Sequence, residues 1–157
     1  MTTAIQRTVP PRVLITLANP VVRLLLRSPL HGLLDPSVLL LHVTGRKTGH
    51  EYAIPVNYAD IDGCLTVVTV AGWRVNLRDN GYLEVTWRGR RRRMHARLDE
   101  DPASVAVSYR RIIDHLGWPR AARQLGISVP GGMTPTLLEL KDAASAYHWS
   151  VITLTAR

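Results

Sequence analysis

The stretch that decides the fold is residues 38–58, VLLLHVTGRKTGHEYAIPVNY. Its first part, residues 38–43, is a short apolar run of strand length rich in Val and Leu. Residues 52–58 follow with a broken alternation of apolar and polar side chains, which is also typical of a strand. Between the two, residues 44–49 (TGRKTG) contain two glycines that permit a tight turn. The stretch therefore predicts two strands joined by a hairpin loop.

The loop at residues 44–49 also predicts an anion site. Arg46 and Lys47 would project from a turn whose backbone N–H groups can converge, and this arrangement suits a phosphate or a carboxylate. A solvated hairpin tip without a ligand is the alternative interpretation. A Walker A phosphate loop is excluded, because Arg46 occupies the position of a required glycine and a strand follows instead of a helix.

Composition limits the class of protein. The chain has 157 residues, of which 46% are hydrophobic and 20% charged, so it predicts one folded domain, 1–157. Its net charge of +8 favours an anionic partner, which could be nucleic acid, a lipid surface or a small molecule. The single cysteine, Cys64, cannot form an internal disulfide and favours a cytoplasmic setting. The most apolar region, residues 13–26, is interrupted by Asn19-Pro20 and Arg23 and is too short for a membrane span.

The pattern along the chain predicts a β-rich centre with helices on either side. Residues 1–10 are a loose leader and residues 11–28 two short helices, whose basic, apolar part (10–27) could rest on an anionic lipid surface. The predicted barrel strands lie within residues 38–98, at 38–43, 52–59, 64–70, 82–87 and 92–98; helices and a loop occupy 102–146, and a closing strand 149–155. Several short antiparallel strands at this spacing suggest a barrel.

The densest charge is Arg88 with Arg90 to Arg93. Aromatic residues, which usually accompany single-strand nucleic-acid binding, amount to only 6% and include no Phe. We therefore predict a solvated hairpin end and no nucleic-acid partner. His and Cys show no metal-binding spacing, and no hydrolase nucleophile motif occurs, so we predict neither a metal site nor a catalytic side chain.

A second informative segment is residues 72–80, GWRVNLRDN, between two predicted strands. It offers an aromatic plane beside an amide and two Arg side chains. Such a helical turn could close over a flat ring system, with Trp73 packing on it and Asn76 hydrogen-bonding. In the alternative interpretation, Trp73 and Leu77 lie one turn apart and only anchor the turn on the core.

Taken together, the two segments resemble the deazaflavin-dependent nitroreductase family, an actinobacterial branch of the split-barrel flavin and deazaflavin oxidoreductases. The resemblance covers about residues 35 to 100. It is carried by the loop at 44–49, Pro55 in the next strand and the motif Trp73-x-x-Asn76-Leu77-Arg78-x-Asn80. It implies a mostly β fold with flanking helices, a split β-barrel of the FMN-binding, pyridoxamine-phosphate-oxidase-like type.

The resemblance also implies a cofactor, the reduced deazaflavin coenzyme F-420, that would deliver a hydride to a quinone, a nitro compound or an activated alkene. The hydride chemistry belongs to the cofactor, which agrees with the lack of a catalytic acid. By similarity, the phosphate and acidic tail would be held by Arg46, Lys47, Thr48 and Gly49; the ring would be lined by Pro55, Val56, Asn57, Thr69 and Trp73; and the groove wall would be stabilised by Asn76 and Arg78. His115 and Trp118 could line an acceptor pocket, with core packing as the alternative for Trp118.

Three departures from the family pattern leave alternatives open. Tyr52 stands where the family often has an Arg, the loop at Ala71-Gly72 is shortened, and residues 114–118 replace a Tyr-rich helix that covers the substrate. The same fold could instead use FMN or haem, or no cofactor. A non-catalytic protein for lipid or another anionic ligand, docked at the inner face of the membrane by residues 10–27, is the alternative from another class. The oligomeric state is open, with a homodimer as one possibility.

Overall fold

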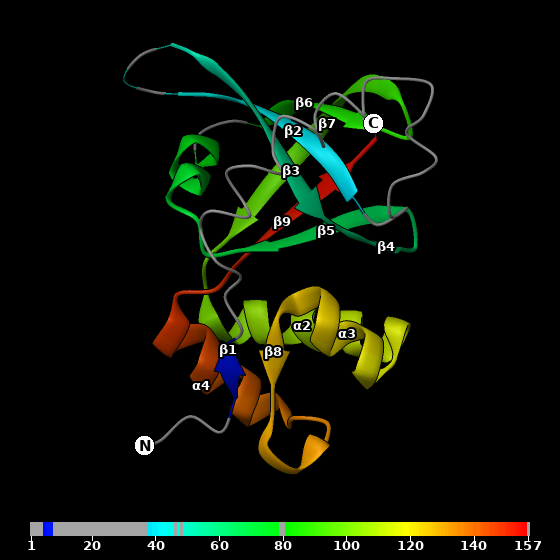
Figure 1. The fold of residues 1–157 in the computed structure, drawn as a ribbon. Helices are drawn as coiled ribbons and strands as arrows, with labels where there is room; N and C mark the ends of the chain where they lie inside the picture. The colour runs from blue at the N-terminus through cyan, green and yellow to red at the C-terminus, as the bar shows by residue number, and fades with distance from the viewer. Residues whose placement is uncertain (1–4, 8–37, 46, 48, 79–80, 157) are drawn as a thin grey trace, which may run out of the picture. The chain divides into compact units, whose positions relative to one another are not determined.

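The computed structural model describes residues 5–7, 38–45, 47, 49–78 and 81–156, and Figure 1 shows their arrangement. They divide into two compact units. Of the described residues, 5–7, 68–70 and 99–152 form the helical unit, and 38–45, 47, 49–67, 71–78, 81–98 and 153–156 form the barrel unit. The predicted helices at 11–28 and most of the leader at 1–10 lie outside the described residues.

Seven of the described strands form one sheet in the order β3-β2-β6-β7-β9-β5-β4 (Figure 1). The strands are β2 (Val38–Thr44), β3 (Glu51–Asn57), β4 (Ala59–Ile61), β5 (Cys64–Thr69), β6 (Tyr82–Trp87), β7 (Arg90–Asp99) and β9 (Ser150–Thr155). Neighbours along the chain pair antiparallel: β2 with β3, β4 with β5, and β6 with β7. The prediction of a mostly β, split-barrel fold with helices is confirmed.

Two tight turns set the strand boundaries. Asp62 and Gly63 have φ angles of 53° and 84°, and Arg88 and Gly89 have 51° and 76°, so both hairpins turn through two left-handed residues, which matches the twist of the strands. Because each turn uses only two residues, β7 begins at Arg90, two residues before its predicted start, and β4 continues to Ile61. The predicted strand 52–59 is interrupted at Tyr58, whose ring is buried.

Alternation along the strands produces the barrel core. On β7, Met94 and Ala96 are buried, whereas Arg93, His95 and Arg97 are exposed. On β2, Leu39 is completely buried, and a side chain of this size contributes about 1.5–3 kcal/mol when it leaves water. Burial of one set of alternating residues therefore fixes the register of β7, whereas β2 is buried on both faces from Leu39 to Val43.

The helical unit contains α2 (Pro102–Leu116), α3 (Trp118–Leu125) and α4 (Leu137–Tyr147), with the short pair β1 (Gln6–Arg7) and β8 (Ile127–Ser128) and the 3-10 turn η3 (Pro130–Gly132). Asp101 caps α2 by accepting from the Ser104 amide, and Thr136 opens α4 in a capping box with Glu139. Tyr109 stacks on Trp149 with ring centroids 4.3 Å apart. No helix in the described part of the chain is long and apolar enough to cross a membrane.

Candidate functional site

The predicted hairpin loop joins β2 to β3. The register pairs Thr44 with Glu51, so the strands are bonded up to the base of the loop. Gly49 has a φ of +71°, a backbone conformation that residues with a side chain rarely adopt, and open space surrounds it. Lys47 is exposed. The loop therefore presents a cation at the end of a well-defined hairpin, while Arg46 and Thr48 lie outside the described residues.

The hydrogen bonds of two loop amides contradict the expectation that the backbone N–H groups of the loop converge on an anion. The Gly45 amide donates to the His50 carbonyl at 2.8 Å, and the Gly49 amide donates to the Gly45 carbonyl at 3.0 Å. Both N–H groups are thus used inside the loop, because closing the turn requires them, and the prediction that they converge on an anion is wrong for these two. Anion binding by the described loop residues therefore depends on the Lys47 side chain.

Strand β3 carries three of the residues assigned to a ring. It lies at an edge of the sheet formed by the described strands, where Pro55 can lack an N–H without removing a bond between inner strands. The register pairs Pro55 with Leu40 and Val56 with Leu39. Successive strand residues point to opposite faces, so the side chain of Val56 lies on the face opposite to those of Pro55 and Asn57. Pro55, Val56 and Asn57 can therefore contact the same ligand only if that ligand extends around the edge of the strand.

The second segment forms the 3-10 helix η2 (Gly72–Leu77), which contacts β2. Leu77 is buried, whereas Trp73 is half-buried. Asn76 donates from Nδ2 to the Trp73 carbonyl at 3.0 Å, and Arg74 donates to the Ala71 carbonyl at the same distance. Leu77 therefore anchors the turn, the amide of Asn76 holds its shape, and part of the Trp73 ring remains open to solvent.

The remaining predicted residues divide between the two units. Arg78 is exposed and belongs to the barrel unit, together with the residues of the loop, β3 and η2. Thr69, His115 and Trp118 belong to the helical unit. His115 is exposed, and Trp118 packs partly buried against the helical core. The described residues contain no cluster of His, Cys, Asp and Glu that could hold a metal ion.

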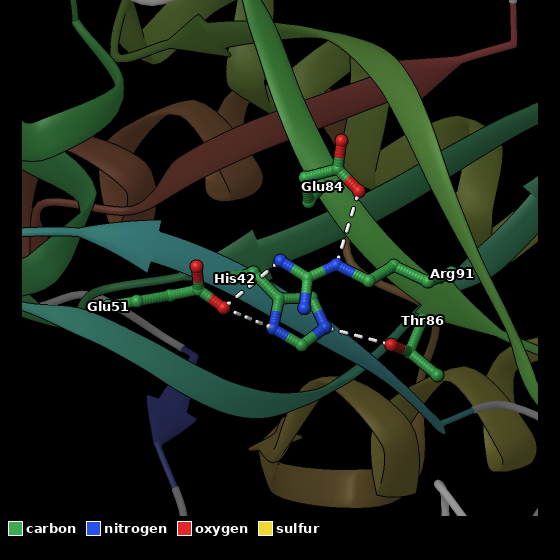
Figure 2. A network of polar contacts seen from close by, with 5 residues as sticks. All are labelled: His42, Glu51, Glu84, Thr86 and Arg91. Atoms are coloured by element: carbon green, nitrogen blue, oxygen red, sulfur yellow. Dashed lines mark hydrogen bonds and ion pairs between the residues drawn. The ribbon is translucent and has the colours of Figure 1, made fainter.

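The structure also shows a polar network that the sequence did not indicate (Figure 2). Oε1 of Glu51 lies 3.2 Å from Nδ1 of His42 and 3.1 Å from Nη2 of Arg91. His42 Nε2 lies 2.8 Å from Thr86 Oγ1, and Arg91 donates from Nε to Glu84 at 3.2 Å. The His42–Glu51 contact has the distance of an ion pair but is not aligned as a hydrogen bond. The only sequence signal was a His in an otherwise apolar strand.

The contacts in this network stabilise the positive charge of Arg91. The pKa of the Arg91 guanidinium is raised above its ordinary value, first by the hydrogen bond to Glu84 and also by the charge of Glu51. Arg91 therefore remains cationic at neutral pH and attracts both of the carboxylates that it contacts.

The arginine run has structural partners as well. Residues 90–93 are exposed, as predicted for a solvated hairpin end. The guanidinium groups of Arg88 and Arg92 lie 4.7 and 5.5 Å from the centre of the Trp87 ring, and that of Arg93 lies 4.6 Å from the Tyr82 ring. These distances are within cation–π range, so three of the arginine side chains interact with aromatic rings of the sheet.

The chain resembles several solved structures at low sequence identity. An F420-H2 dependent reductase shares 16% identity, with 76% of this chain and 96% of that chain covered and a TM-score of 0.46. A pyridoxamine 5'-phosphate oxidase-related, FMN-binding protein from Nostoc punctiforme shares 14% identity over 87% and 78%, with a TM-score of 0.45. A conserved hypothetical protein from Mycobacterium tuberculosis shares 14% over 96% and 83%, with a TM-score of 0.46. At these scores none of them identifies a function for this chain.

Comparison with curated protein sequences finds no match. The sequence model of one protein family, by contrast, matches residues 17–129, which include the loop at 44–49, strand β3 and the turn η2. This match covers more than half of the chain and agrees with the cofactor class that the two motifs imply. The chain belongs to the F420H(2)-dependent quinone reductase family.

Proposed function

We propose that this protein transfers a hydride from reduced coenzyme F-420 to a small organic acceptor, with a quinone as the first candidate and a nitro compound or an activated alkene as the others. The observation that carries the proposal is the family match over residues 17–129, since this range contains both motifs of the candidate site. Coenzyme F-420 is the cofactor of the family, and the acceptor is a small molecule.

The residues present suit a long ligand with an anionic end. Glu51 and Asn57 are the two ends of β3, six positions apart, and an extended strand of that length spans about 20 Å. A cation, Lys47, stands near one end, and the half-buried indole of Trp73 is on a turn that contacts the neighbouring strand β2. This separation supports binding of a tail at the loop and of a ring system farther along the edge.

We assign the tail to Lys47 with Arg46 and Thr48, in the loop that Gly49 closes, and the ring to Pro55, Val56, Asn57 and Trp73; Asn76 and Arg78 would support the groove wall. The roles of Thr69, His115 and Trp118, which belong to the helical unit, stay predictions. When bound, the coenzyme supplies the hydride. The protein contributes orientation: Lys47 attracts the anionic end, and Trp73 packs on a flat ring. Asn76 holds the Trp73 carbonyl and so fixes the turn that carries the indole.

The proposal is tested by titrating the purified protein with F-420 and following the fluorescence of the coenzyme. Binding at or below about 50 μM is expected, which corresponds to about −6 kcal/mol. FMN and haem are titrated in parallel. No F-420 binding at that concentration would contradict the proposal, and tight FMN binding in its place would favour the alternative cofactor.

The acceptor is then identified by steady-state assays in which reduced F-420 is oxidised by a quinone, a nitroarene or an activated alkene. A clear preference for the quinone in kcat/KM would support our first candidate, because enzymes discriminate acceptors by this ratio. A cytoplasmic location, a homodimer and contact with the membrane through residues 10–27 remain predictions.

A further inference from the structure

Glu51 is the first residue of β3 and stands two positions after Gly49, at the base of the hairpin loop. One of its oxygens is held from two other strands, by His42 of β2 at 3.2 Å and by Arg91 of β7 at 3.1 Å. Figure 2 shows both contacts converging on the same carboxylate. The base of the loop is thus attached to the sheet by side chains as well as by the backbone pairing of β3.

The two residues that hold Glu51 are themselves held by β6. The His42 side chain is only 1% exposed, and its other ring nitrogen contacts Thr86 at 2.8 Å. Arg91 donates to Glu84 through Nε and to Glu51 through Nη2, so its planar fork joins two carboxylates from different strands. Neither partner of Glu51 can change its orientation without losing a second contact.

The position of Glu51 is unfavourable for anion binding if only its charge is considered. A carboxylate near a loop that binds an anion repels that anion, and the repulsion acts through half-exposed groups here, since the Glu51 side chain is 50% exposed. A structural contribution that outweighs this repulsion would explain its placement. The contacts to His42 and Arg91 supply one, because they fix the residue from which the loop leaves the sheet.

We propose that Glu51 and Arg91 are positioning residues for the anion-binding end of the hairpin. Arg91 fixes Glu51, and Glu51 fixes the end of the loop that carries Gly49 and Lys47 in the geometry that accepts the anionic end of the coenzyme. Neither residue contacts the ligand in this proposal. The identity of the ligand rests on the proposed function, whereas the fixing of the loop does not.

Two variants that remove the same charge separate positioning from electrostatics. Glu51→Ala and Glu84→Ala each delete one carboxylate that contacts Arg91, but only Glu51 is at the base of the loop. If only charge matters, both variants bind F-420 more tightly. If Glu51 positions the loop, Glu51→Ala raises the Kd of F-420 about 5-fold, as expected from the loss of about 1 kcal/mol, while Glu84→Ala, which removes only a support of Arg91 and keeps both contacts to Glu51, raises it by less than about 2-fold.

A conservative variant and a kinetic measurement sharpen this test. Gln at position 51 keeps an oxygen that can accept from Arg91 but has no charge, so Glu51→Gln should restore binding to within about 2-fold of the wild type. A purely electrostatic role would make Glu51→Gln and Glu51→Ala equivalent.

In steady-state assays, Glu51→Ala should raise the KM for reduced F-420 by the same factor of about 5 and leave kcat unchanged at saturating coenzyme, because the reacting groups are not altered.

Amide hydrogen exchange tests the fixing of the loop without any ligand. The Gly45 and Gly49 amides donate hydrogen bonds that close the loop, so their exchange should be about 5-fold faster in Glu51→Ala than in the wild type and less than about 2-fold faster in Glu84→Ala. Equal exchange in all three proteins, or tighter F-420 binding by Glu51→Ala, would overturn the inference. If exchange differs as expected but the wild type does not bind F-420, positioning is supported and the proposed function fails.

Discussion

The indole Nε1 of Trp87 donates a hydrogen bond of 2.8 Å to the hydroxyl oxygen of Tyr58, 29 residues earlier in the chain. The two rings meet edge to face, with centroids 6.3 Å apart and planes at 88°. Tyr58 lies at the interruption between β3 and β4, and Trp87 is the last residue of β6. This bond therefore joins the end of the candidate coenzyme strand to the neighbouring hairpin.

Removal of the Tyr58 hydroxyl should destabilise the protein. In Tyr58→Phe the partly buried indole N–H loses its acceptor, which should lower the free energy of unfolding by about 1 kcal/mol and the Tm by about 2–4 °C. Thermal unfolding monitored by circular dichroism measures the shift. Tyr52→Phe is the matched control, since Tyr52 is 46% exposed. Equal shifts in the two variants would show that the bond contributes nothing specific.

The charge of the loop should govern coenzyme affinity. Changing Arg46 and Lys47 together to Ala should weaken F-420 binding by about 10-fold or more, because charge-assisted contacts to an anion are the strong ones. The Tm should change little, since Lys47 is exposed. The double variant Arg120→Ala with Lys141→Ala removes the same charge from exposed positions outside the barrel unit. An equal loss of affinity in this control would leave the loop as ordinary surface.

The two apolar residues of η2 should separate binding from stability. Leu77 is 2% exposed, so Leu77→Ala should lower the free energy of unfolding by about 2–5 kcal/mol. Trp73 is half-buried, and Trp73→Ala should cost less stability but more F-420 affinity if the indole packs on the ring. Urea unfolding and fluorescence titration of both variants give the comparison. Unchanged affinity in Trp73→Ala would support the interpretation that the turn only anchors on the core.

The capping box of α4 should stabilise the helical unit. Thr136 accepts from the Glu139 amide, and Glu139 accepts from the Thr136 amide. Thr136→Ala should therefore lower the free energy of unfolding by about 1 kcal/mol. Thr134→Ala, two residues earlier in an exposed loop, should change it by less than about 0.5 kcal/mol. The difference in urea midpoints checks the prediction, and equal midpoints would contradict it.

Local sequence patterns predicted the elements well where one physical rule dominated. Apolar and alternating patterns predicted strands at 38–43 and 149–155, and β2 (Val38–Thr44) and β9 (Ser150–Thr155) lie within one residue of these bounds. The predicted strand boundaries were wrong where strand pairing sets them. Strand β7 begins at Arg90 because a two-residue turn brings Arg90 opposite Trp87. The backbone N–H groups of the loop were predicted to converge on an anion, whereas the amides of Gly45 and Gly49 donate to carbonyls within the loop.

The sequence by itself determined the hairpin at residues 38–58, its cationic loop and the family to which the chain belongs, because turns, alternation and short motifs are local properties. Only the tertiary structure decided that His42, Glu51, Glu84 and Arg91 meet on one face of the sheet. Arg91 contacts Glu84, which lies 7 positions earlier in the chain, and Glu51, which lies 40 positions earlier. Such contacts depend on the register of four strands, which burial of the alternating apolar side chains fixes and which no local pattern encodes.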